Sequence, residues 1–207
     1  MMFEKINLKL KNILSEERYQ HSWQVSKLAE EIAESYHIPS EKAKISGLIH
    51  DCAKDFSYHE LQNLMEKYHI HLTEIEKCIP GIWHAYVGAE LAKELFEIHD
   101  QEMFNAIKYH STGFISLSLL GKIVYVADKI EPGRKMNHTG KIKEMVWSDI
   151  DQAMLVLLNL ELEYLISKNE VIHPNTFETR NKILYEHRLR LTNEKNRKTE
   201  SIKEKEK

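Results

Sequence analysis

Glycine and proline are scarce in this chain, which contains seven Gly and four Pro among 207 residues. This is about half of their usual share, so the sequence lacks most of the residues that make tight turns and bulges. The composition therefore argues against many short strands and favours long helices. Because 42% of the residues are hydrophobic, the chain can also bury one sizeable core. We predict an all-α protein.

Cysteine and long apolar runs are scarce as well. The two cysteines, Cys52 and Cys78, show no CxxC spacing, which argues against a disulfide scaffold or a zinc finger. Charged side chains interrupt the first 14 residues, unlike the apolar segment of a signal peptide, and no run reaches the length that spans a membrane. We therefore expect a cytoplasmic protein without a membrane partner.

Neither sign of charge dominates, because 29 Lys and Arg oppose 32 Asp and Glu and give a net charge of -3. Global charge thus provides no reason to expect a nucleic-acid partner. Charged and polar residues do accumulate at the end of the chain, and we predict that residues 192–207 form a charged tail, either disordered or a frayed helix. Residues 1–15 are expected to form a separate N-terminal helix.

Apolar residues recur at the spacing of helices in a series of segments. Ser57 with Glu60 forms a capping box, Asp100 can cap a later helix, and Ser40 can cap the helix that follows Pro39. The predicted helices cover approximately residues 16–36, 40–50, 58–68, 84–95, 101–110, 116–130, 148–168 and 176–191.

Histidine and aspartate side chains lie on the inward faces or at the ends of several of these helices. A buried imidazole or carboxylate without a partner costs several kcal/mol or shifts its pKa, so a core that holds many of them needs a cation or a complete hydrogen-bond network. Imidazoles and carboxylates without thiolates suit Fe, Mn, Co, Ni or a catalytic Zn. The predicted metal ligands are His21, His50, Asp51, His84, His110 and Asp128.

The adjacent pair His50-Asp51 requires a special geometry. On a continuous helix the two side chains would diverge by about 100°. At the end of a helix, however, the second residue can turn back toward the same ion. For each histidine alone, a hydrogen-bonded core residue is the ordinary explanation, so the metal prediction depends on the whole set.

Four sequence blocks around these residues carry a resemblance to a known family. The series from His21 through His50-Asp51 to Asp128 resembles the pattern of the HD-domain metal-dependent phosphohydrolases. The blocks extend this likeness to the YqeK-type branch, the bacterial symmetrical bis(5'-nucleosyl)-tetraphosphatases. The resemblance spans residues 16–189, and its blocks are Gly47–Asp55, His84–Ala89, Ala106–Gly113 and Tyr125–Arg134.

The resemblance implies a helical HD phosphohydrolase domain over residues 16–191 that hydrolyses diadenosine tetraphosphate to two ADP. The implied nucleophile is a metal-activated hydroxide. A nucleoside diphosphate leaves without much protonation, which agrees with the absence of an evident Ser or Cys nucleophile from the blocks. The expected partners are a dinucleoside polyphosphate and its ADP product, and a homodimer is left open.

The resemblance also implies a metal centre of one or two ions, most commonly iron. It matches His21, His50, Asp51 and Asp128 to the primary ligands. His84 and His110 match positions that hold a second metal or contact the phosphates, and the sequence leaves these two roles open.

Catalytic roles are predicted for Asp51, which can orient the water, and for Lys54, which can meet phosphate charge. Arg134 is a second candidate cation, and Arg18 lies three residues before His21 on the same side of its helix. A solvated surface side chain is the alternative for each of these cations. The predicted substrate-binding set is Arg18, His21, Lys54, His84, His110, Ser111, Thr112, Asp128, Arg134, His173 and Asn175.

Two of these residues are assigned to the nucleobase. His173 and Asn175 could contact the edge of a base, with Pro174 between them restricting the loop, but capping of the following helix explains Asn175 equally well. Two other functions are also left open: a different HD-type nucleotide phosphohydrolase, and a nucleotide sensor that binds without hydrolysis.

Overall fold

The computed structural model describes residues 2–134 and 139–205, and over these ranges it contains helices and no strand. The predicted all-α fold is thereby confirmed. No helix in the described ranges has both the length and the apolar character needed to cross a membrane. The elements are α1 (Met2–Lys11), α2 (Glu16–Ser35), α3 (Ser40–Ile49), α4 (Tyr58–Lys67), α5 (Glu74–Lys77), the 3-10 helix η1 (Pro80–Ile82), α6 (Trp83–Phe96), α7 (Gln101–Lys108), α8 (Leu119–Ile130), α9 (Thr139–Met145), α10 (Ile150–Ser167) and α11 (Pro174–Lys205).

Local capping explains where several helices begin. The capping box of Ser57 and Glu60 opens α4, and the Asp100 carboxylate accepts two backbone N–H groups at the start of α7, as predicted. The prediction for Ser40 is wrong. Pro39 occupies the N-cap position of α3, so Ser40 is already the first helical residue, and Pro39 offers no side-chain hydrogen bond.

The remaining differences from the predicted helices concern short or polar segments. Helices α5 and α9 contain four and seven residues, too few to show a clear apolar period, and were not predicted. Helix α7 ends at Lys108, so His110 follows it in a turn, and α8 starts at Leu119 behind its cap Ser118. Helix boundaries are the least predictable part of a helical pattern because terminal turns compete with loops.

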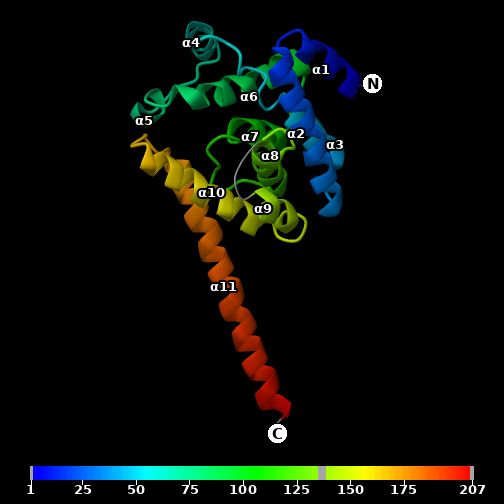
Figure 1. Cartoon of the computed structure of the whole chain (residues 1–207), viewed down its shortest axis with the longest axis vertical. Coiled ribbons are helices and arrows are strands. Elements are labelled where there is room, and N and C mark those ends of the chain that lie inside the picture. Colours follow the sequence, from blue (N-terminus) through cyan, green and yellow to red (C-terminus); the bar gives the residue numbers. More distant parts are fainter. Residues whose placement is uncertain (1, 135–138, 206–207) are drawn as a thin grey trace.

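The core forms around α8, which the neighbouring helices enclose (Figure 1). Its residues 123–127 are fully buried, and helices α2, α3, α7 and α10 all pack against it. A helix that is apolar on all sides must be enclosed in this way. Asp128 therefore enters the interior as part of the most buried helix of the protein's described ranges.

Helix α11 extends away from this body toward the C-terminus (Figure 1). Its first turns pack on α10, with Thr176, Thr179 and Ile183 buried. From residue 188 to residue 193 every side chain is exposed, and the backbone stays helical as far as Lys205. The predicted solvated tail thus continues a helix that begins in the core.

Helices α2 and α3 approach each other closely at Gly47. A Cβ atom at this position would lie 3.1 Å from the Ser26 Cα atom and 3.1 Å from the Val25 carbonyl oxygen, both of them backbone atoms. The Ser26 hydroxyl also donates to the Lys44 carbonyl at 2.7 Å, which fixes the pair of helices at this distance. A side chain at residue 47 would therefore push the two helices apart.

We expect Gly47→Ala to lower the free energy of unfolding by about 1–3 kcal/mol, the usual effect of overpacking a tight interior. Urea denaturation measures this loss of unfolding free energy. Gly140→Ala is the matched control, because no atom of the described residues lies within 4 Å of a Cβ atom there, and the greater helix propensity of alanine should stabilise α9 by up to about 1 kcal/mol. Equal stability of the two variants would contradict the close approach.

Candidate metal centre

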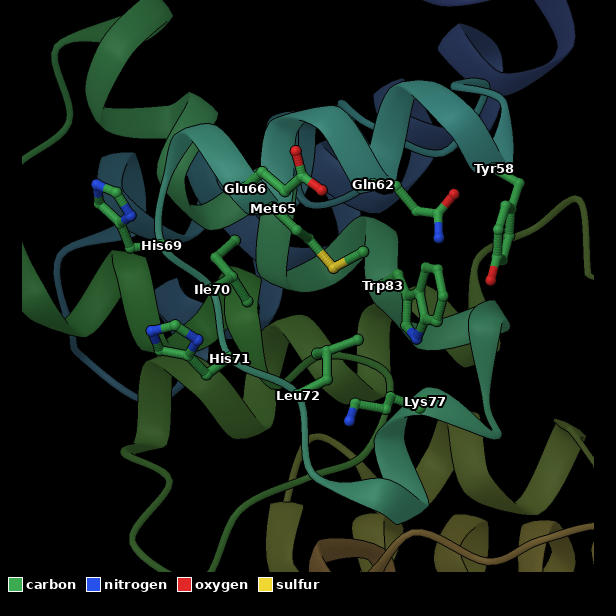
Figure 2. A pocket seen from close by; sticks show the side chains of 10 residues that line it. All are labelled: Tyr58, Gln62, Met65, Glu66, His69, Ile70, His71, Leu72, Lys77 and Trp83. Atoms are coloured by element: carbon green, nitrogen blue, oxygen red, sulfur yellow. The ribbon is translucent and has the colours of Figure 1, made fainter.

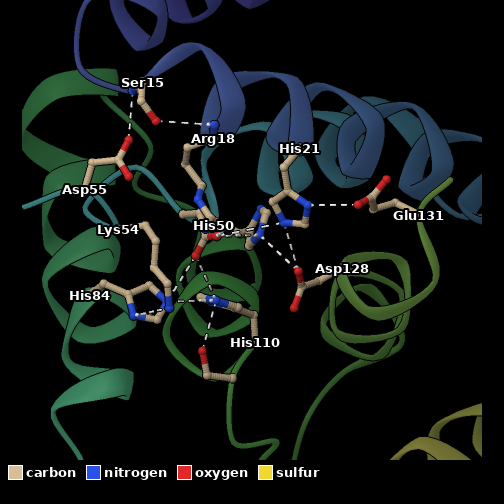
Figure 3. A network of polar contacts seen from close by, with 12 residues as sticks. Ser15, Arg18, His21, His50, Lys54, Asp55, His84, His110, Asp128 and Glu131 are labelled. Carbon is tan, nitrogen blue, oxygen red and sulfur yellow. Dashed lines mark hydrogen bonds and ion pairs between the residues drawn. The ribbon is translucent and has the colours of Figure 1, made fainter. Parts of the chain in front are cut away.

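The structure brings all six predicted metal ligands into one buried cluster (Figure 3). They come from five places along the chain, and most lie at or near helix ends. Helix α2 supplies His21, and the end of α3 with the following turn supplies His50 and Asp51. The remaining ligands are His84 in the first turn of α6, His110 in the turn after α7, and Asp128 in the last turn of α8.

One half of the cluster lies between two carboxylates. The Nε2 atoms of His50 and His21 lie 3.5 Å and 3.8 Å from Asp51 Oδ2. On the other side, the same two nitrogen atoms lie 3.6 Å and 3.0 Å from Asp128 Oδ1. Four ligand atoms thus surround one point, as in a site for a single cation.

The second half of the cluster uses the other oxygen of the same aspartate. Asp51 Oδ1 lies 3.0 Å from His84 Nε2 and 3.4 Å from His110 Nε2. The two imidazoles approach within 3.2 Å of each other at Nε2. Asp51 therefore joins two groups of ligands, His21 with His50 on one side and His84 with His110 on the other.

Unpaired buried atoms show that a cation fits this cluster. The Nε2 atoms of His21 and His50 and the Oδ1 atom of Asp51 are buried and make no hydrogen bond of acceptable geometry to any residue in the described ranges. Buried polar atoms are rarely left unpaired, because the desolvation cost is not recovered. Two of these atoms belong to the His21 half of the cluster and one faces His84 and His110. All three are donors of the kind that divalent ions bind.

Hydrogen bonds on the far side of the rings prepare two imidazoles for this role. His50 Nδ1 donates to the Gly47 carbonyl and His110 Nδ1 donates to the Ile107 carbonyl, each at 2.7 Å. Both acceptors belong to the last turn of a helix, where carbonyl groups lack helical partners. With the proton placed on Nδ1, each Nε2 lone pair faces the cluster.

Glu131 orients the third imidazole, and the sequence analysis assigned it no role. Its Oε1 atom lies 3.1 Å from His21 Nδ1, and its other oxygen accepts the backbone N–H of Gly133. The carboxylate is buried. Such a carboxylate fixes both the tautomer and the orientation of a ligating histidine. The signal for it was its place three residues after Asp128, directly behind the end of α8.

Four cationic side chains of the described residues lie at the cluster. One of them, Lys129, has its Nζ atom 3.8 Å from Asp128 Oδ2, and the other three were predicted from the sequence. Arg18 Nη1 lies 2.9 Å from Asp51 Oδ2, and Arg134 Nη2 lies 2.8 Å from Asp128 Oδ1. Lys54 Nζ lies 3.4 Å from His84 Nδ1, and burial lowers the pKa of this lysine. All three therefore border the cluster. Arg18 and Lys54 are partly buried there, whereas the Arg134 side chain contacts Asp128 and is still 42% exposed to solvent.

Burial and the close pairs determine the charges of the ligands. Burial alone would raise the pKa of Asp51, yet the imidazoles of His50, His110 and His84 hold it well below its usual range. Burial lowers the pKa of His84 to about 4 and also lowers that of His110. At neutral pH the carboxylate is ionised and these two imidazoles are neutral. Both are the forms that bind a cation.

A cavity of about 810 Å³ opens beside the His21 half of the cluster. Arg18 and Gln24 line it from α2, and Pro132 and Arg134 line it from the loop after α8. Its volume falls within the range of small-molecule sites. The cluster is thus accessible from a polar cavity with two guanidinium groups on its walls.

The substrate residues predicted near His110 separate into two groups. The Ser111 hydroxyl lies 3.0 Å from His110 Nε2 and therefore borders the cluster. The Thr112 side chain is buried and donates to the Gly113 carbonyl, while the Thr112 carbonyl accepts from the Thr176 hydroxyl. Its contacts join α11 to the turn after α7.

His173 and Asn175 make contacts with residues outside the metal cluster. The imidazole of His173 is buried, its Nε2 atom is 3.3 Å from Glu76 Oε1, and its Nδ1 atom accepts the backbone N–H of Asn175 at 3.1 Å. Helix α11 begins at Pro174, so His173 caps it and Asn175 is the second helical residue. The alternative of Asn175 as the cap is therefore wrong.

We expect Asp51→Ala to lower metal affinity at least about 100-fold, since loss of an outer carboxylate alone costs about 10- to 100-fold and Asp51 faces both ligand groups directly. Elemental analysis after dialysis measures the metal content. His37→Asn is the control, because His37 is exposed and has a φ of 56°, which asparagine tolerates. An Asp51 variant with full metal content would refute the assignment.

Glu76, which lies outside the metal cluster, should make the stability of the fold depend on pH. Burial opposes its ionisation, but hydrogen bonds from Thr73, Tyr86 and His173 outweigh burial and lower the pKa of Glu76 to about 2. A lowered folded-state pKa stabilises the fold above the unfolded value of about 4.3 and loses that effect as the pH falls toward about 2. The stability advantage of wild type over Glu76→Gln should therefore shrink on acidification below about pH 4.3.

Urea denaturation between pH 7 and pH 3 measures this difference. Glu74→Gln is the control, since Glu74 belongs to the same short helix and its side chain is 89% exposed. An advantage over Glu76→Gln that stays constant with pH would show that the Glu76 charge does not stabilise the junction of α5, α6 and α11.

The sequence and structure of this chain are similar to those of known proteins. The HD domain model matches residues 18–133. The symmetrical bis(5'-nucleosyl)-tetraphosphatase of Bacillus subtilis is 34% identical over 83% of this chain and 92% of its own length, and that of Halalkalibacterium halodurans is 33% identical over 84% and 92%.

A solved structure agrees in fold. The Clostridium acetobutylicum protein described as a predicted HD superfamily hydrolase involved in NAD metabolism superposes with a TM-score of 0.86 at 34% identity, covering 89% of this chain and 97% of that one. The matched residues 18–133 include every ligand of the cluster. The chain therefore belongs to the HD domain family.

Proposed function

We propose that this protein hydrolyses bis(5'-nucleosyl) tetraphosphates symmetrically, so that diadenosine tetraphosphate yields two ADP. The relatives from Bacillus subtilis and Halalkalibacterium halodurans carry this activity in their names and match over most of their length. The observation that carries the proposal is the Asp51 carboxylate, which faces a pair of histidines with each of its oxygens. Such a centre suits attack by water on a phosphoric anhydride.

The native metal is proposed to be iron, with Mn, Co, Ni and Zn as alternatives, and the two ligand groups give room for one or two ions. When bound, such an ion supplies a Lewis acid for phosphoryl oxygens and lowers the pKa of water toward about 7. His21, His50, Asp51 and Asp128 would hold the first ion. His84 and His110, with Asp51, would hold a second.

The side chains around the centre would bind and orient the polyphosphate. Arg18 and Arg134 contact the ligand carboxylates directly, and both line the polar cavity, so their guanidinium groups can turn to phosphate oxygens. Lys54 would compensate the negative charge of phosphate groups near His84. Ser111 would donate a hydrogen bond beside His110. The role proposed for Thr112 is indirect, through the turn that holds His110, and those of His173 and Asn175 are indirect, through the start of α11.

A water molecule is the proposed nucleophile, oriented by Asp51. Cys52, the nearest thiol in sequence, is 1% exposed, and burial raises its pKa to about 12. It therefore stays protonated at neutral pH and cannot attack phosphorus. The leaving nucleoside diphosphate needs little protonation, so no general acid is required. The cytoplasmic location and a homodimer stay predictions from the sequence.

Product analysis tests the proposal. We expect the metal-loaded protein to convert diadenosine tetraphosphate to ADP alone, and hydrolysis in ¹⁸O-labelled water to place one label in one of the two ADP molecules. Ion-exchange chromatography with mass spectrometry measures both results. Removal of metal by a chelator should abolish turnover, and added metal should restore it.

Other products would separate the alternatives. AMP with ATP would contradict symmetrical cleavage, and release of phosphate or triphosphate across a nucleotide panel would indicate another HD-type phosphohydrolase. Tight ADP binding without turnover at saturating metal would indicate a sensor.

A further inference from the structure

A second cavity, of about 650 Å³, lies between α4 and the segment that leads into α6 (Figure 2). Tyr58 and Trp83 lie at one end of it, and His69 and His71 lie at the other. Its volume falls in the range of small-molecule sites. None of the predicted site residues lines it, so the function argued above leaves it unassigned.

The aromatic end of this cavity is connected to the metal cluster. Trp83 immediately precedes His84, and the Trp83 indole N–H donates to the Glu76 carbonyl at 2.8 Å, which fixes the ring. The Tyr58 ring lies 4.8 Å from the Trp83 ring between centroids. Tyr58 also follows Lys54 by one short turn. The first turn of α6 thus links the aromatic end of this cavity to His84, whereas His21 itself lines the polar cavity.

The lining of the second cavity does not suit phosphate. Its charged side chains include Glu66 and Lys77, which balance each other, and the Lys77 ammonium is paired with Glu74 at 2.6 Å. Among the described residues, no arginine lines it. A polyphosphate would find little charge compensation there, so the cavity fits an uncharged group.

The same lining suits a planar heterocycle. Met65 and Leu72 form an apolar floor, Tyr58 offers an aromatic ring that is 53% exposed, and the Gln62 carboxamide points into the space. Stacking on an aromatic ring with a few polar groups at the edge is how proteins hold nucleobases. The chemistry of this cavity is that of a nucleoside site.

We propose that this cavity binds the nucleoside of one half of the dinucleoside substrate. The inference rests on the proposed function. Symmetrical cleavage requires the central anhydride to lie at the cluster, so the two nucleosides must extend in opposite directions. One half then extends along the polar cavity past Arg18 and Arg134, and the other half extends past Lys54 to Tyr58. Two identical halves of the substrate therefore occupy unlike cavities.

Kinetics of a stacking variant test the site. Tyr58→Ala should raise KM for diadenosine tetraphosphate about tenfold, the usual effect of losing one base-stacking contact, with kcat nearly unchanged because the base is remote from the reacting phosphorus. Adenosine 5'-tetraphosphate has one nucleoside and can bind in either direction, so its KM should rise no more than about twofold. Gln62→Arg, which fills the cavity, should act in the same way.

Asn63→Ala is the matched control, because Asn63 is exposed on α4 and does not line the cavity. Its two KM values should equal those of wild type. Unchanged KM for diadenosine tetraphosphate in both cavity variants would overturn the proposal. So would activation by added AMP that both variants abolish without a change in KM, since the cavity would then serve a separate effector.

A binding measurement separates this inference from the proposed function. Adenosine should shift the NMR signal of the Trp83 indole N–H in the metal-free protein, with the signal assigned from Trp83→Phe, and the shift should be lost in Gln62→Arg. If this result is obtained while no hydrolysis of diadenosine tetraphosphate occurs, the proposed function fails and the nucleoside site stands. An unmoved Trp83 signal at millimolar adenosine would overturn the site.

Discussion

The Asp51 carboxylate is the group on which the cluster depends, because its two oxygens face two different pairs of imidazoles. A carboxylate with 3% exposure is stable only where charge or hydrogen bonding replaces water. It lies in the turn that follows α3, which ends at Ile49. The close packing of α2 on Gly47 then holds His21 and His50 within reach of the same oxygen.

Helix ends supply most of the remaining geometry. The last carbonyls of α3 and of the α7 turn accept the Nδ1 protons of His50 and His110, so groups that lack helical partners determine which ring nitrogen faces the cation. The turn after α8 acts on two ligands at once, because Glu131 contacts the His21 imidazole and Arg134 contacts the Asp128 carboxylate. The core helix α8 thus fixes the position of that turn and, through it, one half of the metal centre.

The helical fold and the inward placement of the six ligands could be predicted because apolar periodicity shows which side of each helix is buried, and buried histidines with aspartates imply a common partner. Glu131 was missed because a glutamate before Pro-Gly has the character of a turn. A base contact of His173 stays a prediction, and the sequence did not indicate that His173 caps α11 and contacts Glu76. A sequence does not distinguish a histidine that completes a hydrogen-bond network from one that faces a cavity, since both occupy buried positions.

With metal bound, Asp51 would join two sets of ligands, His21 with His50 and His84 with His110. The most direct test is anomalous X-ray diffraction, at the absorption edge of the bound element, from crystals of protein purified without added metal. We predict anomalous density between Asp51 and the His21–His50 pair, and, with a second ion, density between Asp51 and the His84–His110 pair. Density elsewhere in the protein, with Asp51 outside ligand distance of every ion, would contradict the account.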